Sequence, residues 1–212
     1  MASGGGVCYS EVGRKKMDYL YYKKKIEKFA DENCTVAPGE TDVVFLGDSL
    51  TDFCPLDVYY PEWKTLNRGI AGDTTDGVLR RMSVCAYEVE PKVVVLLIGG
   101  NNLQTMFPDY EEIIKGLLGT LPQTKTLLVS LTPMTTPYAE KNPLSKRNNL
   151  CIKEIAERYG LPFVDLYDDL LDPATQELKD AYTYDGAHLT PDGYTVFTKK
   201  IAAAIRKVLL DK

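Results

Sequence analysis

Residues 92–102 read KVVVLLIGGNN, and this stretch decides the fold. Residues 93–98 are an unbroken run of Val, Leu and Ile. A short run that is apolar at every position is typical of a strand buried on both faces of a parallel sheet. Glycine and asparagine follow directly, and both residue types tolerate the backbone of a turn. The stretch therefore predicts a buried strand that ends in a polar loop.

Similar but shorter runs lie on both sides of this stretch and alternate with helix-like segments. The runs predict further strands at 42–46, 65–70, 126–131 and 162–166. Helices are predicted at 74–86, 109–120, 143–159 and 191–210. Alternating strands and helices indicate β-α-β units. We expect an α/β protein, a flavodoxin-like three-layer α/β/α sandwich with about five parallel strands.

The chain shows no repeat and no break in composition that would divide it. Residues 11–33 mix charged and apolar residues in the pattern of an amphipathic helix on the outside of a domain. We expect one globular domain, in which residues 1–41 are an N-terminal segment with a surface helix and residues 42–212 are the main domain.

Composition excludes several classes of protein. The chain has 212 residues, of which 44% are hydrophobic and 26% charged, as in ordinary soluble globular proteins rather than disordered or collagen-like ones. A formal net charge of -5 without a basic, aromatic-rich patch argues against a nucleic-acid partner. With one histidine, a multi-histidine metal site is excluded. We expect no metal and no cofactor.

Cysteine spacing and hydropathy indicate a location. The five cysteines are an odd number, widely spaced and without a C-x-x-C pair. The N-terminus lacks the apolar region of a secretory signal, and the longest apolar run, 93–98, is too short to span a membrane. We therefore expect a reduced, cytoplasmic protein without a membrane span.

Polar residues and glycines gather where the predicted strands end. Open α/β sheets bind their ligands at the carboxyl ends of the strands, so these loops are the candidate site. The loops read Gly47-Asp48-Ser49-Leu50-Thr51-Asp52, Arg68-Gly69-Ile70-Ala71-Gly72-Asp73-Thr74, Gly99-Gly100-Asn101-Asn102 and, after the last strand, Asp185-Gly186-Ala187-His188.

These loops contain the residue types that activate a hydroxyl group for acyl transfer. An imidazole can take the proton of a serine hydroxyl, which pairs His188 with Ser49. Asp185 can accept the other imidazole N–H and fix the tautomer. The N–H groups of Ser49 and Gly72 and the side-chain amide of Asn101 are candidate donors to an oxyanion.

The histidine also precedes a helix with a readable start. Thr190 is a candidate N-cap, Pro191 occupies the first helical position, and Asp192 adds a negative charge to the first turn. His188 is therefore expected in a loop whose exit is fixed.

Taken together, the four loops resemble the SGNH, or GDSL-type, hydrolase and esterase family. The blocks occur in the family's order, and the resemblance covers residues 42–210. It implies that Ser49 is the nucleophile, His188 the base and Asp185 its orienting partner. Residues 67–75 and the Asn-Asn ending of the third block look most like the catalytic subunits of intracellular platelet-activating-factor acetylhydrolase. Asn102 departs from the commonest pattern, in which aspartate follows the oxyanion asparagine.

Each block alone has an ordinary structural explanation, such as a turn or a helix cap; the joint pattern favours the enzyme. Asp48 and Asp73 are interpreted as residues that orient loops. Three arginines, Arg68, Arg80 and Arg81, are interpreted as partners in surface ion pairs. Five side chains follow predicted strands and can line a substrate pocket or close the core: Phe53, Met106, Phe107, Met134 and Tyr138. Cys54 is a less favoured nucleophile.

The sequence therefore predicts a metal-independent serine esterase for small or medium acyl esters, with acetyl esters favoured. A carbohydrate deacetylase, a lysophospholipase or a thioesterase would use the same residues. A non-catalytic flavodoxin-like module, holding a phosphate on residues 47–51 or acting through subunit contacts, is the alternative from another class. The expected partner is a small-molecule ester, and a homodimer stays open.

Overall fold

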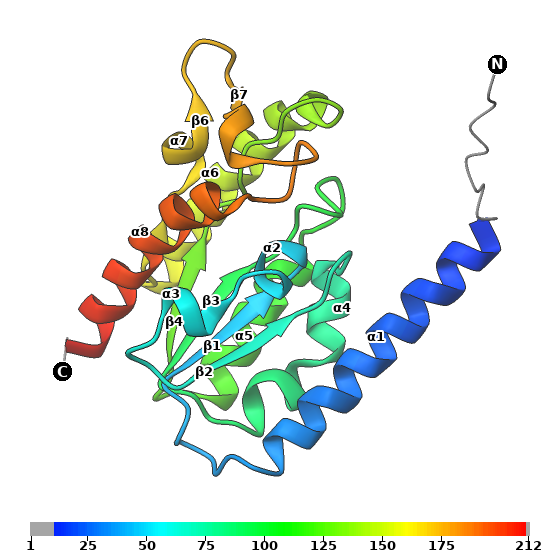
Figure 1. The fold of residues 1–212 in the computed structure, drawn as a ribbon. Coiled ribbons are helices and arrows are strands. Elements are labelled where there is room, and N and C mark those ends of the chain that lie inside the picture. Colours follow the sequence, from blue (N-terminus) through cyan, green and yellow to red (C-terminus); the bar gives the residue numbers. More distant parts are fainter. Residues whose placement is uncertain (1–10, 211–212) are drawn as a thin grey trace.

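The computed structural model describes residues 11–210, with side chains described from Tyr19 onward. Parts of both predicted segments lie outside this range: residues 1–10, including Cys8, and residues 211–212. Five parallel strands form one sheet in the order β2-β1-β3-β4-β5 (Figure 1). They are β1 (Val43–Gly47), β2 (Thr65–Gly69), β3 (Val93–Leu97), β4 (Lys125–Val129) and β5 (Phe163–Val164). The predicted α/β sandwich is confirmed.

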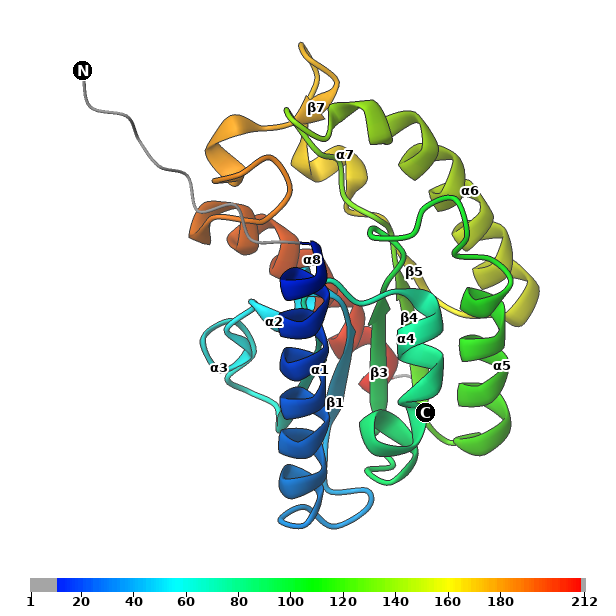
Figure 2. The same cartoon turned by 90° about the vertical axis from the view of Figure 1, so that its right-hand side faces the viewer.

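Helices cover both faces of the sheet (Figure 2). Successive side chains of a strand point to opposite faces, so Val44 and Leu46 face one apolar core while Val43 and Phe45 face the other. The first core is covered by α1 (Glu11–Asn33), α4 (Thr75–Arg80), α5 (Asp109–Thr120) and α6 (Asn142–Tyr159). The second is covered by α2 (Ser49–Asp52), α3 (Leu56–Tyr59), α7 (Tyr167–Leu170) and α8 (Pro191–Leu210).

The strand order places a crevice between β1 and β3. The chain leaves β1 toward α2 on one face of the sheet and leaves β3 toward α5 on the other. Ligands of doubly wound sheets bind where the connections diverge in this way. Gly47 is the register partner of Leu97, so the loops that carry Ser49 and Asn101 begin side by side.

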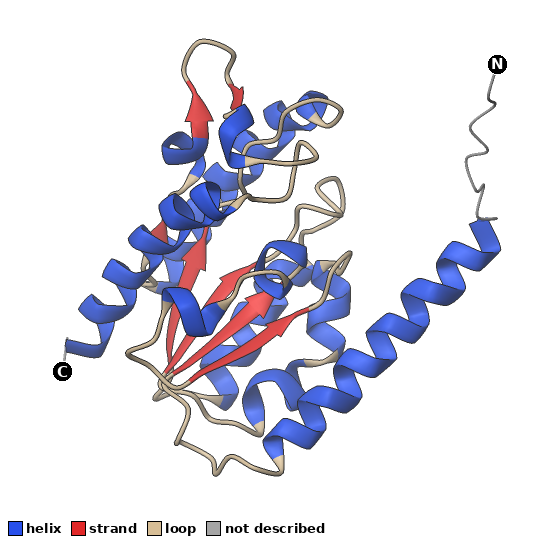
Figure 3. Ribbon diagram, viewed as in Figure 1, coloured by secondary structure: helices blue, strands red, loops and turns tan. Residues whose placement is uncertain are grey.

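Short elements were missed by the sequence patterns (Figure 3). The helix predicted at 74–86 is divided into α4 and a π-helix, η1 (Ser83–Tyr87). The helices α2, α3 and α7 have four residues each, too few for a period to be recognised. The remaining elements are the hairpin of β6 (Leu171–Asp172) and β7 (Glu177–Leu178) and the 3-10 helices η2 (Ala139–Lys141) and η3 (Asp180–Tyr182).

The start of α8 is confirmed. Pro191 is its first residue, and the N–H of Gly193 donates to Thr190 Oγ1 at 3.2 Å. The apolar face of the helix, including Ile201 and Ile205, is buried in the second core. This packing fixes the exit of the loop that carries His188.

Two of the three arginines are buried, so their interpretation as surface residues was wrong. Arg68 is 0% exposed, and its guanidinium reaches Glu32 and the side-chain oxygen of Asn33, at the end of α1. It also lies 4.7 Å from the ring centroid of Phe29. Since three side chains of α1 surround this one cation, Arg68 anchors the helix to the sheet. Arg80 is exposed and pairs with Asp76, as expected.

Arg81 joins the ends of two strands to the loop that follows β2. It is 3% exposed, and its guanidinium donates to the carbonyl of Gly47 at 2.9 Å and to that of Arg68 at 2.7 Å. Its Nε donates to Asp73 Oδ2 at 2.8 Å. Carbonyls at a buried strand end need donors, and one guanidinium supplies them here while pairing with a buried carboxylate.

We expect Arg81→Met to destabilise the protein strongly, because it removes the ionic partner of the buried Asp73 carboxylate and one donor from each of two buried carbonyls. Removal of one member of a buried ion pair costs about 3–5 kcal/mol. The free energy of unfolding from urea titration measures the effect. Arg80→Met is the matched control, since loss of an exposed pair costs about 0–1 kcal/mol. Equal losses in the two variants would contradict this role of Arg81.

Candidate active site

Ser49 is the first residue of α2, directly after β1. Asp48 is the N-cap of this short helix, and its Oδ1 accepts the N–H of Leu50 at 3.2 Å. The Asn67 side chain donates to the carbonyl of Thr51 at 2.7 Å. The Tyr194 hydroxyl donates to the carbonyl of Leu50 at 2.9 Å. Contacts from both sides therefore hold a helix that is too short to be stable alone.

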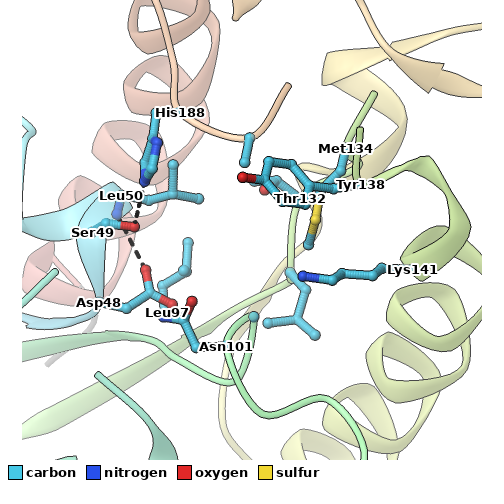
Figure 4. A pocket seen from close by; sticks show the side chains of 13 residues that line it. Asp48, Ser49, Leu50, Leu97, Asn101, Thr132, Met134, Tyr138, Lys141 and His188 are labelled. Atoms are coloured by element: carbon cyan, nitrogen blue, oxygen red, sulfur yellow. Dashed lines mark hydrogen bonds between the residues drawn. The ribbon is translucent and has the colours of Figure 1, made fainter. Parts of the chain in front are cut away.

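The structure brings Ser49, His188 and Asp185 into one hydrogen-bonded chain. Ser49 Oγ lies 2.9 Å from His188 Nε2 (Figure 4). His188 Nδ1 lies 2.6 Å from Asp185 Oδ2. The other carboxylate oxygen of Asp185 accepts the N–H of His188 at 2.8 Å and that of Ala187 at 3.0 Å. The carboxylate thus fixes both the imidazole and the backbone next to it.

The charge of Asp185 sets the tautomer of the imidazole. Partial burial acts to raise the pKa of this carboxyl, but the hydrogen bonds from the His188 ring and from two backbone N–H groups outweigh it and lower the pKa. An ionised carboxylate only accepts hydrogen bonds, so Nδ1 carries the proton. His188 Nε2 is then free to accept the proton of Ser49.

Gly186 lets the His188 loop approach the loop after β4. Its φ is +96°, a conformation that favours glycine, and a Cβ at this position would lie 2.4 Å from the carbonyl oxygen of Thr136. The N–H of Thr135 donates to the carbonyl of Gly186 at 2.9 Å. This close approach connects the loop of the imidazole to the loop that carries Met134 and Tyr138.

The three candidate oxyanion donors lie on three loops. The N–H of Ser49, at the first position of α2, has no acceptor within its own helix. The side-chain amide of Asn101 donates to the carbonyl of Asp73 at 2.9 Å and lines the cavity beside Ser49. Gly72 has a φ of +80° and is not among the residues that line this cavity. Its role as a donor stays a prediction.

Asn102 stabilises the neighbouring loop. Its side-chain amide donates to Thr75 Oγ1 at 2.9 Å, and its oxygen accepts the N–H of Thr75 at 3.4 Å. Although aspartate is commoner at this position, Asn102 also forms hydrogen bonds with its surroundings, through Thr75 at the start of α4.

A cavity of about 170 Å³ opens beside Ser49 and His188 (Figure 4). Met134 and Tyr138 line it, so these two of the five predicted pocket residues are found there. Sequence reasoning missed several further lining residues, among them Leu97, Leu131, Thr132 and Lys141. Three of them, Leu131, Thr132 and Lys141, come from the long connection between β4 and α6, which carries no motif.

The other three predicted pocket residues lie outside the cavity lining. Met106 is fully buried, with its terminal atoms against Gly99, and it belongs to the first apolar core. Phe107 packs on the same core, with its ring 5.8 Å from that of Tyr110. Of the two alternatives for these side chains, closing the core describes both. Phe53 is 45% exposed, and its ring lies 5.3 Å from the His188 ring, at the rim of the site.

Two alternative interpretations of these loops are disfavoured by local chemistry. Burial raises the pKa of the Cys54 thiol to about 12, so the nucleophilic thiolate is not favoured at neutral pH. A phosphate on residues 47–51 would need the first N–H groups of α2. The carboxyl group of Asp48 already occupies this position.

Within residues 11–210, no helix is both long and apolar enough to cross a membrane. The same part of the chain contains no group of three or more His, Cys, Asp or Glu side chains suited to a metal ion. Four cysteines are free: Cys34, Cys54, Cys85 and Cys151. The cytoplasmic location and the homodimer stay predictions.

The chain is similar to known proteins in both sequence and structure. Residues 45–196 match the sequence model of the GDSL-like lipase/acylhydrolase family. Among curated proteins, none matches the chain significantly. A Streptococcus pneumonia protein provisionally described as a platelet activating factor is 26% identical, with a TM-score of 0.81 over 90% of this chain and 95% of that chain.

Two further structures share the fold. A GDSL-like lipase from Bacteroides thetaiotaomicron is 24% identical, with a TM-score of 0.77 over 86% of this chain and 97% of that chain. An acetyl xylan esterase from Geobacillus stearothermophilus is 19% identical, with a TM-score of 0.62 over 80% of this chain and 96% of that chain.

Asp48 gives the site a testable pH dependence. Burial raises the pKa of its carboxyl group to about 7, with the nearby carboxylate of Asp73 adding to the effect, although the Leu50 N–H acts in the opposite direction. Between the unfolded pKa of about 3.9 and the folded pKa, the folded protein binds one more proton at this position than the unfolded chain. This carboxyl group therefore lowers stability as the pH rises through that window.

We expect Asp48→Asn to remove this dependence, because the amide is neutral and its oxygen can still accept the Leu50 N–H. The free energy of unfolding of the variant should exceed that of the wild type by roughly 1–3 kcal/mol at pH 8 and by little at pH 4. Urea titrations at both pH values measure the difference. A gain that is the same at pH 4 and pH 8 would contradict titration of Asp48.

Proposed function

Because the chain belongs to the GDSL-like lipase/acylhydrolase family, we propose that it is a serine esterase for short acyl esters, with acetyl esters favoured. The observation that carries this proposal is the hydrogen-bonded chain from Asp185 through His188 to Ser49, at the edge of a small cavity. Ser49 is the proposed nucleophile, His188 the general base and acid, and Asp185 the group that orients the imidazole.

The proposed reaction has two stages. Ser49 Oγ attacks the ester carbonyl while His188 Nε2 takes its proton. The tetrahedral oxyanion is held by the N–H groups of Ser49 and Gly72 and by the Asn101 amide. His188 then protonates the leaving alcohol, and an acyl group remains on Ser49. Water, activated by the same imidazole, attacks this acyl group and restores the free serine.

In the proposed reaction, the two halves of the substrate lie on different sides of Ser49. The leaving oxygen must lie near His188, because the imidazole protonates it. The acyl group therefore extends to the opposite side, into the cavity toward Met134 and Tyr138 (Figure 4). The leaving alcohol lies on the side of Phe53 and Tyr184, whose rings are 5.3 Å and 6.0 Å from the His188 ring. Both aromatic side chains are exposed, which fits an alcohol that projects into solvent.

The size of the cavity favours a short acyl group over a long one. A cavity of about 150 Å³ holds one benzene molecule, so about 170 Å³ accommodates roughly six heavy atoms. An acetyl group fits with space to spare, whereas the chain of a typical lysophospholipid would extend beyond the cavity. The acetyl xylan esterase that shares the fold makes acetylated carbohydrates one substrate class to test.

Replacing any member of the Ser49–His188–Asp185 chain should abolish hydrolysis of p-nitrophenyl acetate. For Ser49→Ala and His188→Ala we expect kcat/KM to fall by about 10⁴-fold or more, since no second histidine can take over. The kcat/KM of Asp185→Asn should be about 10⁴-fold lower than that of the wild type, because an amide no longer selects the required tautomer. Release of p-nitrophenol measures the rates.

Ser83→Ala is the matched control, because Ser83 is exposed and its hydroxyl only donates to Glu88. It should keep full activity, and all variants should keep the wild-type melting temperature within a few degrees. Turnover by Ser49→Ala above one hundredth of the wild-type rate would exclude Ser49 as the nucleophile. Faster cleavage of p-nitrophenyl octanoate or of acyl thioesters than of acetate would favour the lysophospholipase or thioesterase alternative.

A comparison of the two adjacent asparagines tests the oxyanion site. Asn101→Ala should lower kcat by about 10²–10³-fold with little change in KM, because the amide acts mainly on the oxyanion of the transition state. Asn102→Ala removes only the contacts with Thr75 and should have a smaller effect. Steady-state kinetics with p-nitrophenyl acetate gives both constants. If the two variants lost activity equally, the oxyanion role of Asn101 would be wrong.

A further inference from the structure

A lysine lines the acyl side of the cavity. Lys141 is the last residue of η2, directly before α6, and its side chain is partly buried. Its Nζ points into the cavity, across from Ser49 and His188 (Figure 4). The ammonium lies 4.8 Å from the ring centroid of Tyr138, which holds it by a cation–π interaction.

This ammonium has no ionic partner in the described part of the chain. The lysines that form ion pairs there are Lys23, Lys25, Lys28, Lys92, Lys115 and Lys200. The carboxyl group that also lines the cavity is that of Asp48, and burial disfavours its charged form. The positive charge of Lys141 is therefore not part of an ion pair, and below about pH 7 the Asp48 carboxyl group is mostly neutral.

The surroundings of Lys141 explain how the charge is tolerated without a ligand and why an anion would be bound. On one side Lys141 borders the cavity, next to Leu131 and Met134. On the other it borders a neighbouring hollow of about 520 Å³, which Gly100, Asn101 and the exposed Glu140 also line. Glu140 forms no ion pair with Lys141, and water can reach the ammonium from this side. An anion that enters the apolar side meets a cation in a medium where a charge-assisted hydrogen bond is strong.

We propose that, among short acyl groups of the same size, the cavity selects those that end in a carboxylate, and that Lys141 binds this carboxylate. The inference rests on the proposed function, because the acyl side of the cavity is defined by the position of His188. The substrate class is the half-ester of a short dicarboxylic acid. In a succinyl group, two methylenes and a carboxylate extend beyond the reacting carbonyl, five heavy atoms in all, which the cavity can hold.

Competition against p-nitrophenyl acetate tests the proposal with two compounds of the same size. Monoethyl succinate ends in a carboxylate, and ethyl succinamate ends in a neutral amide. We expect the carboxylate compound to inhibit hydrolysis of p-nitrophenyl acetate at about tenfold lower concentration than the amide, because its hydrogen bond to Lys141 is charge-assisted. The ratio of the two inhibition constants, obtained from steady-state competition kinetics, is the readout.

Lys141→Met keeps the aliphatic stem of the side chain but removes the charge, so it should bring this ratio close to one. Lys153→Met is the matched control: Lys153 is exposed on α6, away from the cavity lining, and its loss changes the net charge equally. The control should keep the wild-type ratio. A wild-type ratio near one, or a high ratio that persists in Lys141→Met, would overturn the proposal.

The two proposals fail in different ways. If wild-type protein hydrolyses p-nitrophenyl acetate with dependence on Ser49 but shows no preference for the carboxylate compound, only the role of Lys141 is wrong. If p-nitrophenyl acetate is not hydrolysed, the proposed esterase function is wrong and the acyl preference falls with it.

Discussion

The buried guanidinium of Arg81 is the interaction on which the rest of the site depends. It binds the last carbonyl of β1, a carbonyl of β2 and the carboxylate of Asp73. Asp73 in turn accepts the side-chain amide of Asn101 through its own carbonyl. One cation therefore connects the strand that leads to Ser49 with the loops of two candidate oxyanion donors. Such an arrangement is stable only when every buried polar group is satisfied.

The N-terminal helix is connected to the same loops by a second set of contacts. Asp52, at the end of the Ser49 helix, accepts hydrogen bonds from Lys25 of α1 and from the N–H of Ala71, at 2.6 Å and 2.8 Å. The Tyr21 hydroxyl also donates to this carboxylate. The helix is thus more than a cover for the sheet, since its side chains also contact the carboxylate that binds the loop containing Gly72.

The chemistry proposed for the site follows from how loops far apart in the chain are held together. The register of β1 with β3 places the Ser49 and Asn101 loops side by side, and Gly186 lets the His188 loop pack against residues 135–136. In the proposed reaction, the leaving alcohol and the acyl group then lie on different sides of Ser49. In the same proposal Lys141 lines the acyl side of the cavity, and only the packing of these loops puts it there.

The sequence alone predicts the strands, the parallel α/β class and the loops that meet at the sheet edge, because apolar runs and strand-end glycines are local patterns. It also singled out Ser49, Asp185 and His188, which the fold brings within hydrogen-bond distance. Only the tertiary structure shows that Arg81 is buried, since its partners lie 8, 13 and 34 residues away. It likewise placed Met106 in the core and Lys141 in the cavity, because burial depends on what the folded chain packs against each side chain and not on its neighbours in sequence.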